Sequence, residues 1–385
     1  METSLWEQRK LGDIASFING RAYKQKELLD HGKYKVLRVG NFYTNSEWYY
    51  SNLELADKFY AHTGDLLYTW SATFGPHIWT GEKVIYHYHI WKILLSKDLN
   101  RDFAVQLLKR DQEQIMVGLN GSTMIHITKS GMEKKQVRIP AIREQKFIAD
   151  FFNELDKTIA LHQRQLNQLQ TLKREFLKRL FPQREQQQPQ LRFTGFDDAW
   201  EQRKLGDIAD ISRGASPRPI QDSKWFDDES DIGWLRISDV TEQNGRIHHL
   251  EQHISILGQK KTRVLTSPHL LLSIAATVGK PVINYVKTGV HDGFLIFYNL
   301  RANQEFLYQW LEMYRPLWQK YGQPGSQVNL NSELVKNQIV MLPEIDEQAR
   351  IVAFLTGIDH TIALHQKKAA CLKALKASFL QKLFV

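Results

Sequence analysis

The sequence predicts an α+β protein of two mixed α/β globules, each followed by a long helix, with the two helices packed as an antiparallel coiled coil. Three observations predict it. Residues 6–15 recur letter for letter as 200–209. A stretch free of proline and glycine runs from 144 to 181, and a matching stretch closes the chain. Short runs rich in Val, Ile, Leu and aromatic residues, bounded by Gly, Pro, Asn and Asp, predict strands between these landmarks.

Both long segments carry apolar residues at alternating steps of four and three, the spacing of a heptad seam. The first seam comprises Leu155, Ile159, His162, Leu166, Leu169, Lys173, Phe176 and Leu180. The second comprises Ile358, Ile362, His365, Ala369, Leu372, Lys376, Phe379 and Leu383, at an offset of 203 residues. The two histidines are interpreted as polar residues that fix the helix register, with a pH switch as the alternative.

Each helix is on the order of 55 Å long at about 1.5 Å per residue, and a lone helix of that length cannot bury its apolar stripe. We therefore expect the two helices to pack on each other, with an approximate internal two-fold axis. The repeat divides the chain into a globule at 1–142, a helix at 143–182, a linker at 183–199, a globule at 200–345 and a helix at 346–385. The linker is rich in glutamine and flanked by proline, which predicts a flexible connector.

Matched segments inside the globules predict further elements. Strands are expected at 36–41, 65–75 and 137–140, and at their counterparts 234–239, 269–279 and 340–343. Helices are expected at 103–116 and 305–314, and the Gly-Ser pair at 121–122 has a counterpart at 325–326. Each half is therefore predicted to be a mixed globule that ends in its long helix.

Composition narrows the class of protein. The 385 residues carry a formal net charge of +9, which suits a polyanionic partner. A single cysteine, Cys371, excludes an intramolecular disulfide and indicates a reducing compartment; we interpret its side chain as small apolar filler beside the seam. The sequence opens without a signal-peptide pattern and has no apolar window of about 18 residues, so a cytoplasmic protein without a membrane span is expected.

Catalytic motifs are missing from the sequence. It has no Gly-x4-Gly-Lys-Ser/Thr loop, no Gly-x-Gly-x-x-Gly loop and no Asn-Pro-Pro-Tyr run, and neither Cys-x2-Cys nor His-Glu-x-x-His occurs. His87 and His89 alternate along an expected strand, where packing is a better interpretation than a metal site. We therefore predict no catalytic residue, metal or cofactor in this chain.

Basic and polar side chains near the loops of each globule are candidate DNA contacts, because Arg and Asn can read base edges while Lys and Thr hold phosphates. The candidates are Arg21, Lys24, Arg38, Asn41 and Thr73 in the first half, and Arg213, Arg218, Arg236, Lys260, Lys261, Arg263 and Thr277 in the second. Any one of them can be an ordinary exposed side chain. Arg38 and Arg236 occupy matched positions, which favours them.

The chain resembles the specificity subunits of Type I restriction-modification systems. The resemblance rests on Trp-Glu-Gln-Arg-Lys-Leu-Gly-Asp-Ile-Ala opening each half, on Leu-Leu-Leu-Ser-Ile-Ala-Ala-Thr-Val-Gly at 270–279, and on Pro followed by Glu-Gln before each long helix. It implies two target-recognition domains, at about 16–137 and 210–339, that read the halves of a split duplex DNA site, with the helices as a ruler.

The resemblance also implies partners. Two modification subunits would carry S-adenosylmethionine and methylate adenine N6 after flipping the base. Restriction subunits would use ATP and Mg for translocation and cleavage, and this chain would bind no cofactor itself. Two other interpretations stay open: a coiled-coil scaffold that binds proteins, and a methyltransferase or nuclease acting alone. Salt-dependent binding to duplex DNA discriminates the scaffold from the DNA reader.

Overall fold

The computed structural model describes residues 6–43, 45–71, 73–117, 127–183, 186–321 and 330–384. The chain forms two compact units, Met1–Gln163 with Lys367–Val385, and Arg164–Gln366. Each long helix therefore starts in one unit and ends in the other. The division into consecutive segments at 142, 182, 199 and 345 stays a prediction, and the Gly-Ser pairs at 121–122 and 325–326 lie outside the described residues.

The first unit contains two four-stranded sheets, ordered β2-β9-β6-β7 and β4-β3-β8-β5, and a separate antiparallel pair of β1 with β10. The strands are β1 Glu7–Lys10, β2 Ala15–Asn19, β3 Tyr34–Leu37, β4 Tyr49–Ser51, β5 Tyr60–Ala61, β6 Leu66–Thr69, β7 Gly75–Ile78, β8 Val84–Tyr86, β9 Ile90–Leu95 and β10 Gln136–Ile139. All four residues of β6 are buried because it lies inside its sheet, between β9 and β7.

The second unit has a related topology with a five-stranded sheet β12-β19-β16-β17-β14, a three-stranded sheet β13-β18-β15 and the antiparallel pair β11-β20. The strands are β11 Glu201–Lys204, β12 Asp210–Arg213, β13 Gly233–Trp234, β14 Arg246–Ile247, β15 Arg263–Leu265, β16 Leu270–Ser273, β17 Pro281–Asn284, β18 Thr288–Val290, β19 Phe294–Tyr298 and β20 Ile339–Leu342. In the first unit β3 pairs in parallel with β8, and in the second β13 pairs in parallel with β18 and β14 with β17.

Helices complete each globule. The first has α1 Leu11–Ile14, α2 Arg101–Val117 and α3 Lys129–Lys134, with the 3-10 helices η1 Gln25–Glu27, η2 Val39–Phe42 and η3 Asp57–Phe59. The second has α5 Leu205–Ile208, α6 Ile237–Glu242, α7 Ile256–Gln259, α8 Gln304–Tyr314 and α9 Ser332–Lys336, with η4 Ser223–Trp225 and η5 Arg315–Tyr321. The helices expected at 103–116 and 305–314 are thus present as α2 and α8.

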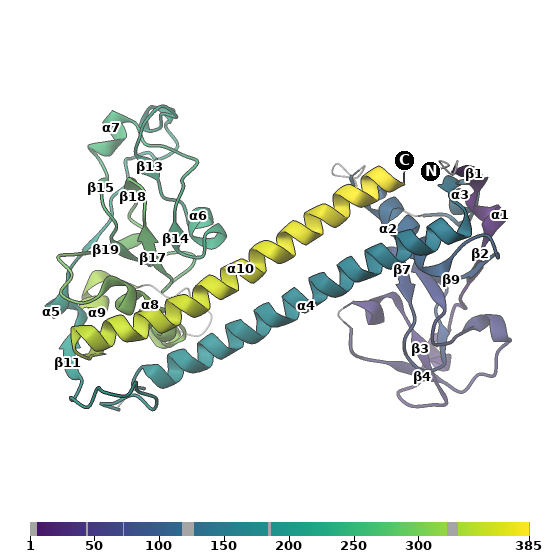
Figure 1. Ribbon diagram of the computed structural model, residues 1–385, viewed down its shortest axis with the longest axis horizontal. Helices are drawn as coiled ribbons and strands as arrows, with labels where there is room; N and C mark the ends of the chain where they lie inside the picture. Colours follow the sequence, from purple (N-terminus) through teal and green to yellow (C-terminus); the bar gives the residue numbers. More distant parts are fainter. Residues whose placement is uncertain are drawn as a thin grey trace. The chain divides into compact units, whose positions relative to one another are not determined.

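The long helices are α4 Ile142–Leu180 and α10 Ile345–Leu383. Within each unit they lie side by side in opposite directions (Figure 1). In the first unit the Phe151 and Phe379 rings meet edge to face at 5.1 Å, and in the second Phe176 and Phe354 do so at 4.8 Å. Every described seam position is buried or half-buried. The antiparallel helix pair that the heptads predicted is therefore present.

The repeated motifs tie the start of each long helix to its own globule. Trp6 Nε1 donates to Glu144 Oε1 at 3.1 Å, and Trp200 Nε1 donates to Glu347 Oε2 at the same distance. The following glutamine, Gln145 or Gln348, accepts a hydrogen bond from the backbone N–H of an asparagine. That asparagine, Asn100 before α2 and Asn303 before α8, caps the globule's helix. The repeated ten-residue block that begins at Trp6 or Trp200 and the Glu-Gln pair recur together because they form the junction between each globule and its long helix.

Each unit has one main core that includes the end of a long helix. In the first unit, Leu380 and Phe384 of the α10 end pack with Phe103 and Phe152. In the second, Leu180 and Phe181 at the α4 end pack with residues such as Phe306. The Phe181 and Phe306 ring centroids are 5.1 Å apart. Burying such large side chains stabilises each unit and fixes the helix ends.

Several local expectations are wrong. Strand structure ends at Leu37 and Trp234, and the rest of 36–41 and 234–239 forms η2 and the start of α6. Strands β6 and β16 likewise end at 69 and 273, so the remainder of 65–75 and 269–279 is mostly loop. The side chain of Cys371 is exposed and does not fill a gap beside the seam.

The described end of the linker makes specific contacts with α10. Arg192 makes a two-pronged ion pair with the fully buried carboxylate of Glu347, at 2.8 Å for both contacts. The ring centroid of Phe193 lies 5.8 Å from that of Phe354. The end of the linker therefore packs on α10. Among the described residues no helix combines the length and the apolar character that a membrane crossing requires.

Candidate nucleic-acid interface

One turn in each unit lies beside several of the candidate DNA contacts. The first turn, residues 87–89, joins β8 to β9, and the second turn, residues 291–293, joins β18 to β19. Each turn follows a strand, β8 or β18, that pairs in parallel with β3 or β13. Arg38 comes just after β3 and Arg236 just after β13, so each arginine reaches the sheet edge at which the turn lies. The expectation that His87 and His89 alternate along a strand is wrong, because both lie in this turn.

A glycine allows the neighbouring strand to press against each turn. A Cβ atom on Gly20, after β2, would lie 2.3 Å from the carbonyl oxygen of His87. A Cβ on Gly214, after β12, would lie 2.1 Å from the carbonyl oxygen of His291. Only glycine fits at this approach, so the same backbone framework supports both turns.

Aromatic rings make up the first turn. The ring centroids of Tyr88 and His89 are 3.8 Å apart, and Trp70 packs on Tyr88 at 5.9 Å and on His89 at 5.0 Å. Trp70 also donates its indole N–H to the Tyr88 carbonyl oxygen at 2.9 Å. Trp70 stacks at 5.7 Å on Trp91, which is buried, while Tyr88 is 37% exposed. A stacked aromatic column therefore runs from the core to an exposed tyrosine.

Of the candidate DNA contacts in the first half, Arg21 and Arg38 lie beside the turn. The Arg21 backbone bridges to His87, and its guanidinium pairs with Glu27 at 2.7 and 3.1 Å. Arg38 lies next to the turn, because the His87 N–H donates to the Leu37 carbonyl, and its guanidinium stacks on Tyr49 at 4.2 Å. Thr73 is exposed in the loop after β6.

Lys24 and Asn41 complete the first set. Lys24 is exposed at the start of η1. Asn41 uses its side-chain amide to hold the loop after Arg38: its Oδ1 accepts from the Arg38 N–H at 3.0 Å, and its Nδ2 donates to the Glu47 carbonyl at 2.9 Å. Asn41 therefore shapes the loop in this structure.

Charged groups surround the second turn, with Asp292 at its centre. Arg213 Nε donates to the Asp292 carbonyl oxygen at 2.5 Å, Arg218 pairs with Asp292 Oδ2 at 2.6 Å, and Ser216 Oγ donates to Oδ1 at 2.7 Å. The Arg218 side chain is 70% exposed despite this ion pair. Asp292 thus holds two of the predicted arginines at one edge of the second unit.

The remaining predicted residues of the second half border the same turn. The side chain of Thr262 donates to the Ala215 and Val290 carbonyl oxygens, which places the exposed Lys260, Lys261 and Arg263 beside it. The loop carrying Thr277 is joined to the turn by the Ile274 N–H, which donates to the Gly293 carbonyl at 2.8 Å.

Arg236 is more constrained than sequence reasoning implied. It pairs with Asp239 at 2.8 Å and with Glu251 at 3.0 Å, and these hydrogen bonds raise the pKa of its guanidinium. Its first-half counterpart, Arg38, has no carboxylate partner among the described residues and instead stacks on a tyrosine. The matched positions therefore differ in how much charge they present.

Burial and charge set the protonation of the turns. Burial lowers the pKa of His87 to about 4, helped by the nearby His89 and Arg38, so its imidazole is neutral at pH 7. Burial also lowers the pKa of His291. For Asp292, burial acts to raise the pKa, but the Ser216 hydrogen bond and the charges of Arg218 and Arg213 bring it below its usual value. The second turn therefore keeps an ionised carboxylate between cations.

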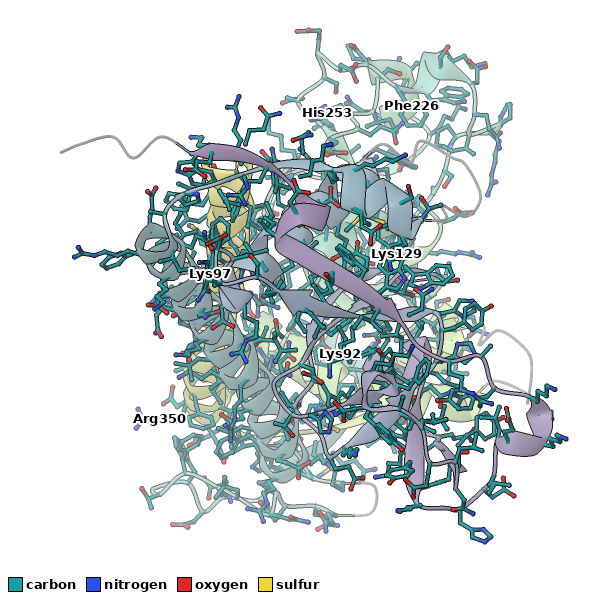
Figure 2. The ribbon with its side chains drawn as sticks, turned by 90° about the vertical axis from the view of Figure 1, so that its right-hand side faces the viewer. Lys92, Lys97, Lys129, Phe226, His253 and Arg350 are labelled. Carbon is teal, nitrogen blue, oxygen red and sulfur yellow. The ribbon has the colours of Figure 1, made fainter. Side chains whose placement is uncertain are left out.

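Three residues labelled in Figure 2, Lys92, Phe226 and His253, have contacts within the globules. Lys92 (Figure 2) is buried in β9 and pairs with Asp65 at 2.7 Å, also donating to the Tyr60 carbonyl. Phe226 and His253 lie together in the second globule (Figure 2), where the Asp227 N–H donates to the His253 carbonyl at 3.2 Å. These contacts stabilise the globules and leave the turns as the candidate interface.

Sequence reasoning missed Trp70, Tyr88 and Asp292. One signal was in the sequence: the matched segments 65–75 and 269–279 align Trp70 with Ile274, so the two halves differ in chemistry at that position. The correspondence of Tyr88 with Asp292 is given by the two turns of the structure. Only the pairing of distant strands shows that these positions meet the basic residues.

A family profile described as Type I restriction modification DNA specificity domain matches residues 3–171 and 197–374. The chain belongs to this family. The two matched stretches are two copies of the specificity domain, one in each half, so the protein is a Type I specificity subunit with two target-recognition domains.

Named relatives agree with the family. The chain is similar to the Type I restriction enzyme MjaVIII specificity subunit of Methanocaldococcus jannaschii, with 21% identity over 389 residues, 94% of this chain and 88% of the relative. It is also similar to the EcoBI specificity subunit of Escherichia coli, with 21% identity over 377 residues, 90% of this chain and 78% of the relative. Both relatives are named for the specificity role.

Solved structures share the fold. The S subunit from the Type I restriction-modification system of M. genitalium matches with a TM-score of 0.62 at 15% identity, covering 100% of this chain and 97% of that one. A chain from a study of complex assembly and conformational transition of the type I R-M system matches with a TM-score of 0.63 at 16% identity, covering 98% and 97%. At such identities the likeness concerns the fold alone.

Proposed function

We propose that this specificity subunit recognises a bipartite duplex DNA site, with the first globule reading one half-site and the second reading the other. The observation that carries the proposal is the pair of turns, 87–89 and 291–293, built on one backbone frame with different side chains. Basic residues surround both turns, as phosphate binding requires, and the exposed groups within them differ, as independent base readout requires.

We further propose that the α4–α10 pair sets the spacing between the half-sites. One added heptad lengthens a helix by about 10.5 Å, or roughly three base pairs. Inserting one heptad into both helices is expected to lengthen the nonspecific spacer and leave both half-sites unchanged.

The chemistry is assigned to partners. Two modification subunits with S-adenosylmethionine would methylate adenine N6, and restriction subunits with ATP and Mg would cleave, with this chain bringing them to the site in the cytoplasm. Support comes from the sequence, which lacks the loops and motifs that those cofactors require. In this proposal the chain supplies recognition and contributes no catalytic group.

The test is genome-wide adenine methylation in cells that carry this chain with its cognate modification subunit, compared with cells that carry that subunit alone. The expected result is a new split motif around a fixed spacer. Exchanging residues 16–137 for the equivalent segment of another specificity subunit should then change one half-site only. A change in both half-sites, or no new motif from two soluble and associated proteins, would contradict the proposal.

A further inference from the structure

In each unit one aspartate joins the two long helices, and the two aspartates are matched by the repeat. In the first unit, Lys376 Nζ of α10 contacts both oxygens of Asp156 of α4, at 2.6 and 2.8 Å. In the second unit, Lys173 Nζ of α4 contacts Asp359 of α10 at 2.5 Å. Asp156 and Asp359 are counterparts at the 203-residue offset of the repeat, and so are Lys173 and Lys376. The same interaction therefore occurs twice, with the helices exchanging donor and acceptor.

These pairs are set apart from ordinary surface ion pairs by their burial. The side chains of Lys173 and Lys376 are 14% and 15% exposed, whereas those of Glu154 and Lys157, another ion pair on α4, are 70% and 72% exposed. A partly buried charge that loses its partner keeps the cost of desolvation without the compensating attraction. Any helix arrangement that separates the matched pairs is therefore disfavoured.

Each carboxylate also contacts the globule of its own unit. Lys109 of α2 lies 3.4 Å from Asp156, and Gln309 of α8 donates to Asp359 Oδ2 at 2.9 Å. In each unit, therefore, two long helices and one helix of the globule meet at the side chain of one aspartate. The contact holds the globule on the helix pair as well as holding the helices together.

The heptad seam alone does not distinguish one register from the next. Sliding the helices by seven residues again places apolar seam residues opposite each other, because the pattern repeats. It would bring Lys376 opposite Ala149 or Gln163 in place of Asp156, and Lys173 opposite Val352 or Gln366 in place of Asp359. None of these is acidic, and Asp359 is the only acidic residue of α10 beyond its first turn.

We infer that Asp156 and Asp359 are positioning residues that fix the register of α4 and α10 and thereby the DNA spacer that the subunit accepts. The inference rests on the proposed function, since it concerns the spacing between half-sites. It adds the side chains responsible: apolar residues hold the helices together, and the two Asp–Lys pairs select one register among those that the heptads permit.

The test uses the full chain in complex with its modification subunit and duplexes that carry the same half-sites with different spacers. The double variant Asp156→Asn with Asp359→Asn is compared with the wild type by the ratio of affinities for the preferred spacer and for each altered spacer. We expect this ratio to fall roughly tenfold while both half-site sequences stay the same. A role in stability alone would weaken binding to every spacer equally and leave the ratio unchanged.

Two further variants serve as controls for this test. Asp156→Glu with Asp359→Glu retains both charges and should restore most of the discrimination, and Glu154→Gln removes an exposed carboxylate of α4 and should leave the ratio unchanged. The single Asn variants are assayed as well, so that the test stands if the double variant does not fold. A folded Asn variant with wild-type discrimination would overturn the inference and assign the register to the helix ends in the two cores. A wild-type complex indifferent to spacer length would instead overturn the ruler itself.

Discussion

The first turn (87–89) and the second turn (291–293) occupy the same place in their units and differ in almost every exposed group. His87 and His291 correspond, and a glycine presses against each of them. The next residue differs. In the first turn it is Tyr88, which packs on Trp70, and in the second it is Asp292, which binds Arg213 and Arg218. The backbone frame is shared, and the chemistry that it presents is not. Under the proposed function, one fold would read two different half-sites by changing a few side chains at a fixed edge.

The shared frame can be broken at its glycines, which should give the largest effect. Gly20→Ala and Gly214→Ala each force a methyl group into a backbone carbonyl, and overpacking of this kind costs about 1–3 kcal/mol of stability. Denaturant unfolding measures the loss. Gly357→Ala is the matched control, because a Cβ there meets no atom within 4 Å and alanine favours a helix. Equal behaviour of Gly214→Ala and Gly357→Ala would contradict the close approach.

The salt dependence of DNA binding can distinguish the aromatic first turn from the charged second turn. Tyr88→Ala should weaken binding to the cognate duplex by roughly tenfold, about 1.4 kcal/mol, with little change in its salt dependence, because a ring contact releases no counterions. Arg218→Ala should reduce the slope of log affinity against log salt by about one if Arg218 binds a phosphate.

Controls for this comparison lie in the same chain. Tyr88→Phe keeps the ring and should retain most of the affinity. Arg203→Ala removes an exposed arginine of β11, already paired with Glu201, and should leave the slope unchanged. If Tyr88→Ala and Arg218→Ala lower the salt slope alike, the two turns do not differ in the way that the structure indicates.

Lowering the pH should destabilise the first unit more than the second, and this difference is the smallest effect that we predict. Burial lowers the pKa of His77, as it does that of His87, to about 4 from a usual value of 6.5. Between pH 6.5 and 4 the unfolded chain therefore binds more protons at these sites, and stability falls as the pH falls through this window. The second turn has His291 alone, with Asp292 opposing its shift.

Limited proteolysis of the full chain at pH 7 and pH 5 measures this difference. Cleavage within the first unit is expected to rise more than cleavage within the second. His77→Asn with His87→Asn should remove the excess sensitivity of the first unit. An equal rise in both units, or a double variant that stays as acid-sensitive as the wild type, would refute the assignment to these two histidines.

The sequence by itself determined the two-fold repeat, the long helices and their seam, because heptad spacing and long identities are local patterns that a single chain displays. It also supplied the Arg and Lys residues that border the turns. It did not show that Arg38 and Arg236 occupy the N-cap positions of η2 and α6, since strand ends depend on pairing with β8 and β18.

Only the tertiary structure placed Trp70, Tyr88 and Asp292 among those basic residues, and only it gave Lys173 and Lys376 their carboxylate partners on the opposite helix. These contacts join segments far apart in the chain, and no local pattern encodes which of several exposed polar groups will meet. Heptads predict that two helices pack; the Asp–Lys distances indicate the register in which they do so.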